Sequence, residues 1–351
     1  MSGYFRRKAL ASAGFPFLLI GTIFFTACEK PARELALAGR TMGTTYSIKL
    51  VYRGPAPDAG VIQRGVDSLL ATVNSQMSTW DPNSEISRFN RLTTDELFPI
   101  SDEFDRVIDQ SLAIAKLTDG AFDITVGPLI DLWGFGAGAK RGKTDPPRQE
   151  EIVATLDRIG YRKIGIRHQS LVKLNPNIHL DLSAIAKGYG VDAVSDWLAA
   201  RGFVNYLVEI GGEVYCRGLN LYSAPWQIGI DTPNLDAFPG ERLQAIADLS
   251  DMGMATSGDY RNYFLYEGKL YSHIIDPRTG YPVETSVASA TVVAPRCMDA
   301  DGYATSLLVL GEHQGLALIE SLAGVEALLI IREGENRFRT VKSSGMRVRE
   351  E

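Results

Sequence analysis

Residues 271 to 282 place three chemically useful side chains around one turn, in the order Tyr-Ser-His-Ile-Ile-Asp-Pro-Arg-Thr-Gly-Tyr-Pro. The proline and the glycine of this segment are typical of a tight turn. His273, Asp276 and Arg278 add a proton carrier, an anion and a cation suited to phosphate. The segment is therefore a candidate active-site loop. The alternative interpretation is a solvated hairpin end with an incidental histidine.

Asp301 and Thr305 are four residues apart, so in a helix they lie on one face. A carboxylate and a hydroxyl form an oxygen pair suited to Mg²⁺, which takes its other ligands from waters and substrate phosphates. The pair therefore indicates a magnesium site only if a phosphorylated ligand binds beside it. The alternative is an aspartate at the N-cap of a helix, bonded to nearby amides.

Other segments combine glycines or small residues with polar side chains. They are residues 39–44, residues 120–128 and residues 181–188. The first could be a strand-entry turn, and Asp123 with Thr125 in the second could cap a buried turn. Lys187 in the third stands in the first turn of an expected helix, where the helix dipole disfavours a cation. This position suggests that Lys187 faces an anion.

Hydrophobic periodicity predicts the elements that position these residues. We expect amphipathic helices over residues 61–77 and 102–118, the second with Ser101 as N-cap. Residues 178–200 read as strand, turn and helix, with Ser183 as a candidate cap, and residues 134–147 as a mobile loop. The other expected elements are strands at 44–51, 206–210, 226–230, 255–256, 261–266, 288–293 and 327–331, and helices at 301–309 and 315–322. Because strands and helices mix without a regular βαβ repeat, the pattern favours an α+β fold.

Charge narrows the classes of partner. The net charge is −6, from 36 basic and 42 acidic residues, and no basic patch interleaved with aromatic residues follows the N-terminal segment. This composition argues against nucleic acid as a partner.

The N-terminal segment has the features of a secretory signal that ends at a cysteine. Three basic residues precede an apolar run, and Ala27-Cys28 follows it. We therefore expect a signal peptide over residues 1–27, lipidation at Cys28, a tether over residues 28–38 and a folded part outside the cytoplasm. The alternatives are an uncleaved membrane anchor and an ordinary signal. Cys216 and Cys297 stand in apolar surroundings, so two buried free thiols are favoured over a single disulfide.

Taken together, these segments resemble the ApbE family, the bacterial FAD:protein FMN transferases, from Gly39 to about Gly311. The matching motifs are Thr-Met-Gly-Thr, Met-Ser-Thr-Trp with Ser-Glu-Ile-Ser-Arg-Phe-Asn, Phe-Asp-Ile-Thr-Val-Gly-Pro-Leu, Asp-Leu-Ser-Ala-Ile-Ala-Lys-Gly-Tyr, Gly-Gly-Glu, Thr-Ser-Gly-Asp-Tyr, His-Ile-Ile-Asp-Pro-Arg-Thr-Gly and Ala-Asp-Gly-Tyr-Ala-Thr. All of them occur in the family's order.

The resemblance implies an ApbE-like, T-fold-type α+β domain over residues 39–345, with mixed sheets, packed helices and two intertwined halves. It also implies a lipoprotein on the periplasmic side of the bacterial inner membrane, which binds FAD with Mg²⁺. Such an enzyme transfers FMN to a threonine or serine of an acceptor protein through a phosphoester bond and releases AMP. Acceptors would carry a Ser/Thr-Gly-Ala-Ser/Thr-type motif in subunits of respiratory sodium-pumping or electron-transfer complexes.

The resemblance also implies roles for individual residues. Flavin contacts fall on Met42, Trp80, Ala121, Phe122, Asp123, Lys187 and Ile275. Metal ligands fall on the Ala184 carbonyl, Asp301 and Thr305, with Ala304 alongside. Many relatives have tyrosine where this chain has Trp80, and both keep an aromatic plane for stacking. We hypothesise that His273 is the base that deprotonates the acceptor hydroxyl, with Asp276 as its orienter or an alternative base.

Two other functions fit the same residues. A Mg²⁺-dependent FAD pyrophosphatase would use water in place of the acceptor hydroxyl and give FMN and AMP. A non-catalytic lipoprotein would bind FAD for storage or presentation, but storage needs no metal at the pyrophosphate, so the Asp301 and Thr305 pair argues against it.

Overall fold

The structure is a computed structural model of the chain, and it describes residues 1, 3, 30–138, 145–233, 240–260, 262–334 and 337–350. The folded unit begins at Ala32. Cys28 and almost all of the expected signal peptide lie outside the described residues. None of the helices in the described part has the length and apolar character needed to cross a bilayer.

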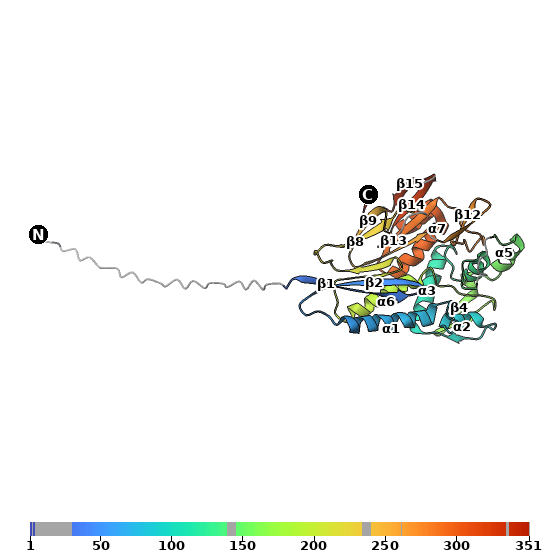
Figure 1. Cartoon of the computed structure of the whole chain (residues 1–351), viewed down its shortest axis with the longest axis horizontal. Helices are drawn as coiled ribbons and strands as arrows, with labels where there is room; N and C mark the ends of the chain where they lie inside the picture. Colours follow the sequence, from blue (N-terminus) through green and yellow to red (C-terminus); the bar gives the residue numbers. More distant parts are fainter. Residues whose placement is uncertain are drawn as a thin grey trace. The chain divides into compact units, whose positions relative to one another are not determined.

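A large antiparallel sheet forms the centre of the folded unit (Figure 1). Within the described residues it has eight strands, in the order β1-β2-β6-β7-β10-β13-β14-β15. Their bounds are β1 (Ala32–Thr41), β2 (Thr44–Arg53), β6 (Tyr206–Ile210), β7 (Glu213–Arg217), β10 (Met252–Gly258), β13 (Val287–Ala294), β14 (Glu326–Gly334) and β15 (Arg337–Lys342). In the first four strands and again in the last four, neighbouring strands follow their order along the chain. The sheet therefore consists of two halves with similar strand order. The expected α+β architecture is confirmed.

The two halves meet along β7 and β10. Their register covers three residue pairs, from Cys216 opposite Met252 to Val214 opposite Met254. β7 starts directly after the Gly211-Gly212 turn, whereas β10 continues to Gly258 and is paired there with β13 alone. The neighbouring strands therefore part at the end of this short seam.

Helices α6 (Ala186–Ala199) and α7 (Cys297–Glu320) contact each other and the sheet, one from each half. Gly188 makes their close approach possible, because a Cβ at this position would lie 2.5 Å from the Cys297 carbonyl oxygen. The N-terminus of α7 is held by Asp192, a buried carboxylate that accepts hydrogen bonds from the amides of Cys297 (2.9 Å) and Met298 (3.0 Å). This contact anchors the helix that carries Asp301 and Thr305.

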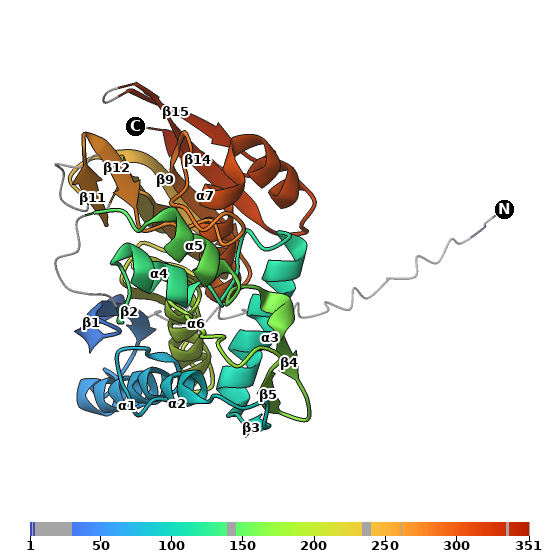
Figure 2. The same ribbon diagram turned by 90° about the vertical axis from the view of Figure 1, so that its right-hand side faces the viewer.

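Other helices and strands surround this centre. A three-stranded sheet, β16 (Val348–Glu350), β9 (Leu243–Leu249) and β8 (Trp226–Asp231), packs apolar side chains against strands of the large sheet. Figure 2 shows α1 and α2 together at one end of the molecule and α7 beside β14 at the other. The remaining elements are α1 (Ala59–Met77), α2 (Glu85–Arg91), β3 (Phe98–Pro99), α3 (Asp102–Leu117), α4 (Gly127–Trp133), α5 (Gln149–Leu156), the 3₁₀ helix η1 (Tyr161–Lys163), β4 (Ile164–Ile166), β5 (Ser170–Lys173), β11 (Tyr263–Tyr266) and β12 (Lys269–Ser272).

Most of the longer elements expected from periodicity are confirmed. The helices expected at 61–77 and 102–118 are α1 and α3, and the expected strands correspond to β2, β6, β8, β10, β11, β13 and β14. Arg261, the expected start of β11, and residues 139–144 of the expected loop lie outside the described residues. Both remaining thiols are free and buried, as expected.

Several expectations were wrong. Residues 32–38 of the expected tether belong to β1, which pairs with β2 along its full length. Residues 178–182 are extended but form no strand, because the Asn90 side chain bonds both the amide and the carbonyl of Leu180 in place of a neighbouring strand. Helix α6 is capped at Ile185 and not at Ser183. In contrast, the two helices expected at 301–309 and 315–322 are confirmed as two helical stretches within α7, separated by a break at Gly311, where φ is 76° and ψ is −177°.

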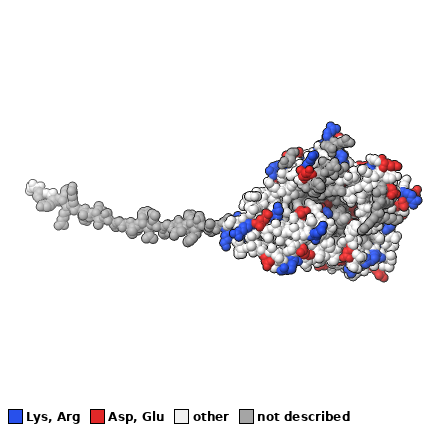
Figure 3. Space-filling view, viewed as in Figure 1, with Lys and Arg blue, Asp and Glu red and all other residues white. Residues whose placement is uncertain are grey.

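Charged side chains of both signs are interspersed over the face shown in Figure 3. This distribution agrees with the moderate net charge of −6.

Candidate active site

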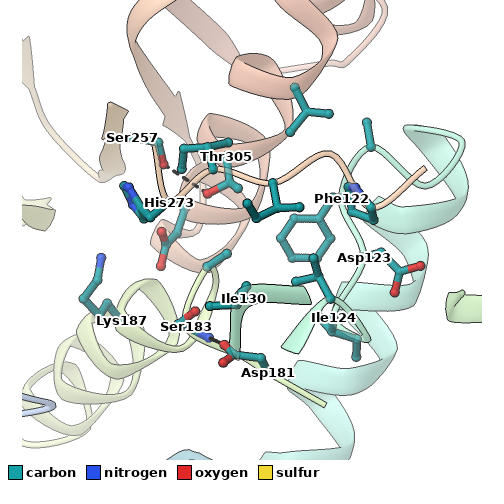
Figure 4. A pocket seen from close by; sticks show the side chains of 18 of the residues that line it. Phe122, Asp123, Ile124, Ile130, Asp181, Ser183, Lys187, Ser257, His273 and Thr305 are labelled. Carbon is teal, nitrogen blue, oxygen red and sulfur yellow. Dashed lines mark hydrogen bonds between the residues drawn. The ribbon is translucent and has the colours of Figure 1, made fainter. Parts of the chain in front are cut away.

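A cavity of about 390 Å³ opens where β7 and β10 part. Both halves of the sheet contribute to it: Glu213 comes from β7, Ser257 from β10, Lys187 from α6, and Asp301 with Thr305 from α7. Figure 4 shows Lys187 and His273 on one side of this cavity, with Phe122 and Ile130 among the residues farther across. Residues from six well-separated parts of the sequence thus surround one space.

Asp301 and Thr305 share one face of α7, as their spacing predicts. The Asp301 side chain is buried, and its Oδ2 accepts a hydrogen bond of 2.9 Å from the Gly188 amide. The Thr305 hydroxyl lies 3.0 Å from the Ser257 hydroxyl (Figure 4). Because α7 begins at Cys297, Asp301 is not the N-cap of its own helix, and it binds a free amide in the first turn of α6.

Lys187 lies between two acidic side chains. Its ammonium forms an ion pair with Glu213, whose side chain is almost completely buried. Burial alone would lower the pKa of Lys187, but the carboxylates of Asp301 and Glu213 raise it above its ordinary value. Burial raises the pKa of both carboxyl groups, and Lys187 opposes this effect without cancelling it. The cluster therefore places two buried carboxyl groups beside one ammonium, and their raised pKa values favour a proton kept on this pair.

His273 is held so that one ring nitrogen remains available. Its Nδ1 lies 3.0 Å from the carbonyl oxygen of Asn262, and its ring contacts the edge of Phe135. Among the described residues, no side chain or backbone group bonds Nε2. Burial lowers the pKa of His273, so the imidazole is neutral at pH 7 and can accept a proton at Nε2.

Asp276 builds the turn and does not contact His273. Its carboxylate binds Arg278 through two nitrogens, at 2.9 and 2.8 Å, and its carbonyl accepts the Gly280 amide at 2.8 Å. The contact expected between Asp276 and His273 is thus made by the Asn262 carbonyl. Ile275, next to this turn, is buried and lines the cavity.

A second cavity, of about 440 Å³, adjoins the first and shares Lys187 and His273 with it. Met42 and Trp80 line this second cavity, together with Val73, Met77 and Phe135. The Trp80 side chain is 71% exposed, so its ring is free to stack on a planar ligand. The apolar walls of this cavity suit an aromatic ring, and Lys187, which lines both cavities, places a cation beside that ring.

Ala121, Phe122 and Asp123 line the first cavity, but the Asp123 carboxylate points away from Lys187 and His273 (Figure 4). It accepts hydrogen bonds from the Thr125 amide (2.8 Å), the Thr125 hydroxyl (2.7 Å) and the Tyr161 amide (2.7 Å). The side chain therefore builds a buried turn, the alternative considered for it, and this turn presents Phe122 to the cavity.

Ala184 also lines the first cavity, whereas Ala304 is fully buried and lines neither. Glu213, Ser257 and Asn262 contact the predicted site residues, but sequence analysis assigned no role to them. The first two lie within the Gly-Gly-Glu and Thr-Ser-Gly-Asp-Tyr motifs, so motif membership was the available signal. Asn262 acts through its backbone carbonyl, which no side-chain pattern reveals.

The fold is an α+β arrangement of two half-sheets with two adjoining cavities where they meet. The family model described as the ApbE family matches residues 42–329, so the chain belongs to the ApbE family. The resemblance was predicted to end at about Gly311, and the family model continues to residue 329, within β14.

Named relatives agree with this assignment. The chain is 43% identical to an FAD:protein FMN transferase of Vibrio cholerae, over 94% of this chain and 96% of the relative. It is 41% identical to an FAD:protein FMN transferase of Haemophilus influenzae, over 92% of this chain and 93% of the relative. A solved structure, the flavin transferase ApbE from Vibrio cholerae, superposes with a TM-score of 0.81 at 42% identity and covers 90% of this chain and 98% of that chain. The structure of the ApbE protein of Thermotoga maritima gives a TM-score of 0.76 at 28% identity and covers 89% of this chain and 97% of that chain.

Proposed function

We propose that this chain is an FAD:protein FMN transferase that moves FMN from FAD to a threonine or serine hydroxyl and releases AMP. One observation supports this assignment most strongly: Lys187, His273, Asp301 and Thr305 line one cavity that adjoins the apolar cavity of Trp80. Phosphate-binding and proton-accepting groups therefore lie beside a place for an aromatic ring. The named relatives share this activity in their descriptions.

The residues of the first cavity fit a magnesium ion. Two buried carboxyl groups, Asp301 and Glu213, lie beside the single ammonium of Lys187, and Glu213 Oε2 has no hydrogen-bond partner among the described residues. By the family resemblance, Asp301, the Thr305 hydroxyl and the Ala184 carbonyl would hold the ion. When bound, Mg²⁺ would neutralise the negative charge that develops on the pyrophosphate oxygens.

The protein residues supply positioning and proton transfer. Lys187 would bind a phosphate oxygen of FAD, and Trp80 would stack on the isoalloxazine ring. The acceptor oxygen forms a bond to the FMN phosphorus while the bond from that phosphorus to the bridging oxygen breaks. The bridging oxygen leaves with AMP, and His273 Nε2 takes the proton of the acceptor hydroxyl.

The test is incubation of the protein with FAD, Mg²⁺ and a peptide that carries Ser-Gly-Ala-Thr, followed by detection of covalent flavin fluorescence on a denaturing gel. Fluorescent peptide is the expected result. Free FMN without labelled peptide would indicate the pyrophosphatase, and intact FAD would indicate a binding protein. His273→Ala should lose transfer and keep FAD affinity, and full transfer by this variant would refute the role of His273.

The sequence motif of the acceptor and the cellular location of this protein are a separate part of the proposal. The Ser/Thr-Gly-Ala-Ser/Thr-type acceptors and the periplasmic side of the inner membrane follow from the family resemblance and from the signal that ends at Cys28. Metabolic labelling with palmitate should mark the wild-type protein and not Cys28→Ser. Equal labelling of both proteins would contradict lipidation at Cys28.

A further inference from the structure

A third cavity, of about 320 Å³, adjoins the cavity of Asp301 and Thr305. Gly211 and Thr256 line both this cavity and the cavity of Asp301 and Thr305. None of its lining residues belongs to the cavity of Met42 and Trp80. The third cavity therefore reaches the phosphate end of the proposed FAD site and not the flavin end.

The charge of the third cavity disfavours a nucleotide. Glu209 and Asp231 line it, and no lysine or arginine is among its described lining residues. The Glu209 carboxylate is fixed by the Gly212 amide (2.8 Å) and the Ser47 hydroxyl (3.0 Å), and Asp231 accepts the Gly240 amide at 3.0 Å. The fixed carboxylate of Glu209 disfavours a phosphate group beside it, so AMP or the FAD pyrophosphate is a poor occupant of this space.

The walls of the third cavity expose peptide backbone. Gly211, Gly212 and Gly229 contribute no side chains, which lets another backbone approach closely. Gly229 belongs to β8, and within the described residues β8 pairs only with β9 and has a free second edge. The six residues of β8 give this edge a length of roughly 20 Å, at about 3.3 Å per residue. An extended segment of another chain can pair with such an edge.

We propose that the third cavity is the docking site of the acceptor protein, whose modified segment lies extended along the free edge of β8. This inference rests on the proposed function, because it places the acceptor hydroxyl beside Gly211 and Thr256, at the opening to the FAD phosphates. The narrow, glycine-lined walls select small residues next to the modified threonine or serine. The Glu209 carboxylate selects neutral or basic residues over acidic ones next to it.

Thr45→Trp tests the docking directly. Thr45 is exposed on β2 and lines the third cavity, so a tryptophan there would fill the cavity from a strand position that tolerates aromatic residues. The matched control is Lys49→Trp, which is exposed on the same face of β2 but does not line the cavity. We expect KM for the Ser-Gly-Ala-Thr peptide to rise at least about tenfold in Thr45→Trp and to stay unchanged in Lys49→Trp. Kd for FAD should be unchanged in both variants.

A second test of the docking site uses only the wild-type protein and one conservative variant, Glu209→Gln. Peptides with lysine on both sides of the motif should have a KM about fivefold lower than peptides with glutamate, and Glu209→Gln should narrow this difference. Equal KM values for the two peptides, an unchanged KM in Thr45→Trp, or weaker FAD binding in Thr45→Trp would each overturn the docking site. Absence of any transfer by the wild-type protein with FAD bound would instead refute the proposed function, and the docking inference with it.

Discussion

Gly188→Ala should damage the proposed magnesium site through the contact between α6 and α7. An alanine Cβ would lie 2.5 Å from the Cys297 carbonyl oxygen and 2.8 Å from Asp301 Cβ. The shorter distance is about 0.9 Å below an ordinary 3.4 Å contact, and a backbone atom cannot move aside as the end of a side chain can. The two helices must therefore separate, which lengthens the 2.9 Å hydrogen bond from the Gly188 amide to Asp301.

The expected loss of stability follows from three contributions. Overpacking a buried contact costs about 1–3 kcal/mol. Loss of a hydrogen bond to a charged group costs about 1.5–3 kcal/mol. Alanine regains about 1 kcal/mol over glycine inside a helix. The free energy of unfolding should therefore fall by about 1.5–5 kcal/mol.

Gly302→Ala is the matched control. Gly302 follows Asp301 in α7, but its Cβ would clash with side-chain ends alone: Ile114 Cδ1 at 2.6 Å, with Ile185 Cδ1 at an ordinary 3.6 Å. Its free energy of unfolding should stay within about 1 kcal/mol of wild type. Urea unfolding gives both values, and the Mg²⁺ concentration for half-maximal transfer should rise in Gly188→Ala alone. Equal stability and equal Mg²⁺ dependence of the two variants would refute the reasoning.

Three further predictions concern the site itself. Asp301→Asn should lower the rate of transfer by about a hundredfold or more at fixed Mg²⁺, because it removes the charged metal ligand, and isothermal titration with Mg²⁺ should show weaker binding. Trp80→Ala should weaken FAD binding by roughly tenfold and Trp80→Phe by much less, as measured by flavin fluorescence titration; equal losses would argue against stacking. Because burial lowers the pKa of His273, the neutral base persists below pH 6.5, so transfer should lose activity only at a pH below that ordinary value. An acidic limb above pH 6.5 in the pH profile of kcat would contradict this environment.

The sequence predicted those elements whose apolar residues have a clear period and a buried face. Helix α1 buries Ile62, Val66, Leu70 and Val73 at helical spacing, so its bounds were predicted to within two residues at either end. Strand β1 could not be predicted in this way, because it is the edge strand of the sheet and lies partly exposed next to the N-terminal segment. Its partner β2 supplies the hydrogen bonds that define it, and those depend on tertiary structure.

Some residues of the site could likewise be predicted from the sequence, and others could not. Asp301, Thr305, Lys187 and His273 were predicted because their chemistry is carried by side chains within recognisable motifs. The Asn262 carbonyl could not be predicted, because every residue has one and only the fold places it 3.0 Å from His273. Asp276 looked suitable as an orienter in the sequence, yet its own turn brings Arg278 closer than any other partner. Local geometry decided between two plausible carboxylate roles.

The short seam between β7 and β10 links ligand binding to the cohesion of the molecule. Lys187 and Glu213 come from one half-sheet and its helix, whereas Ser257 and Asp301 come from the other, and three residue pairs join the two halves along the seam. A molecule of FAD held by both sides would act as a noncovalent cross-link between them. At a hundredfold excess over its Kd, such a ligand adds about 2.7 kcal/mol to the folded state. This added stability should be greatest at the seam between β7 and β10. Bound FAD should therefore slow hydrogen exchange of the β7 and β10 amides more than that of amides in strands distant from the cavity.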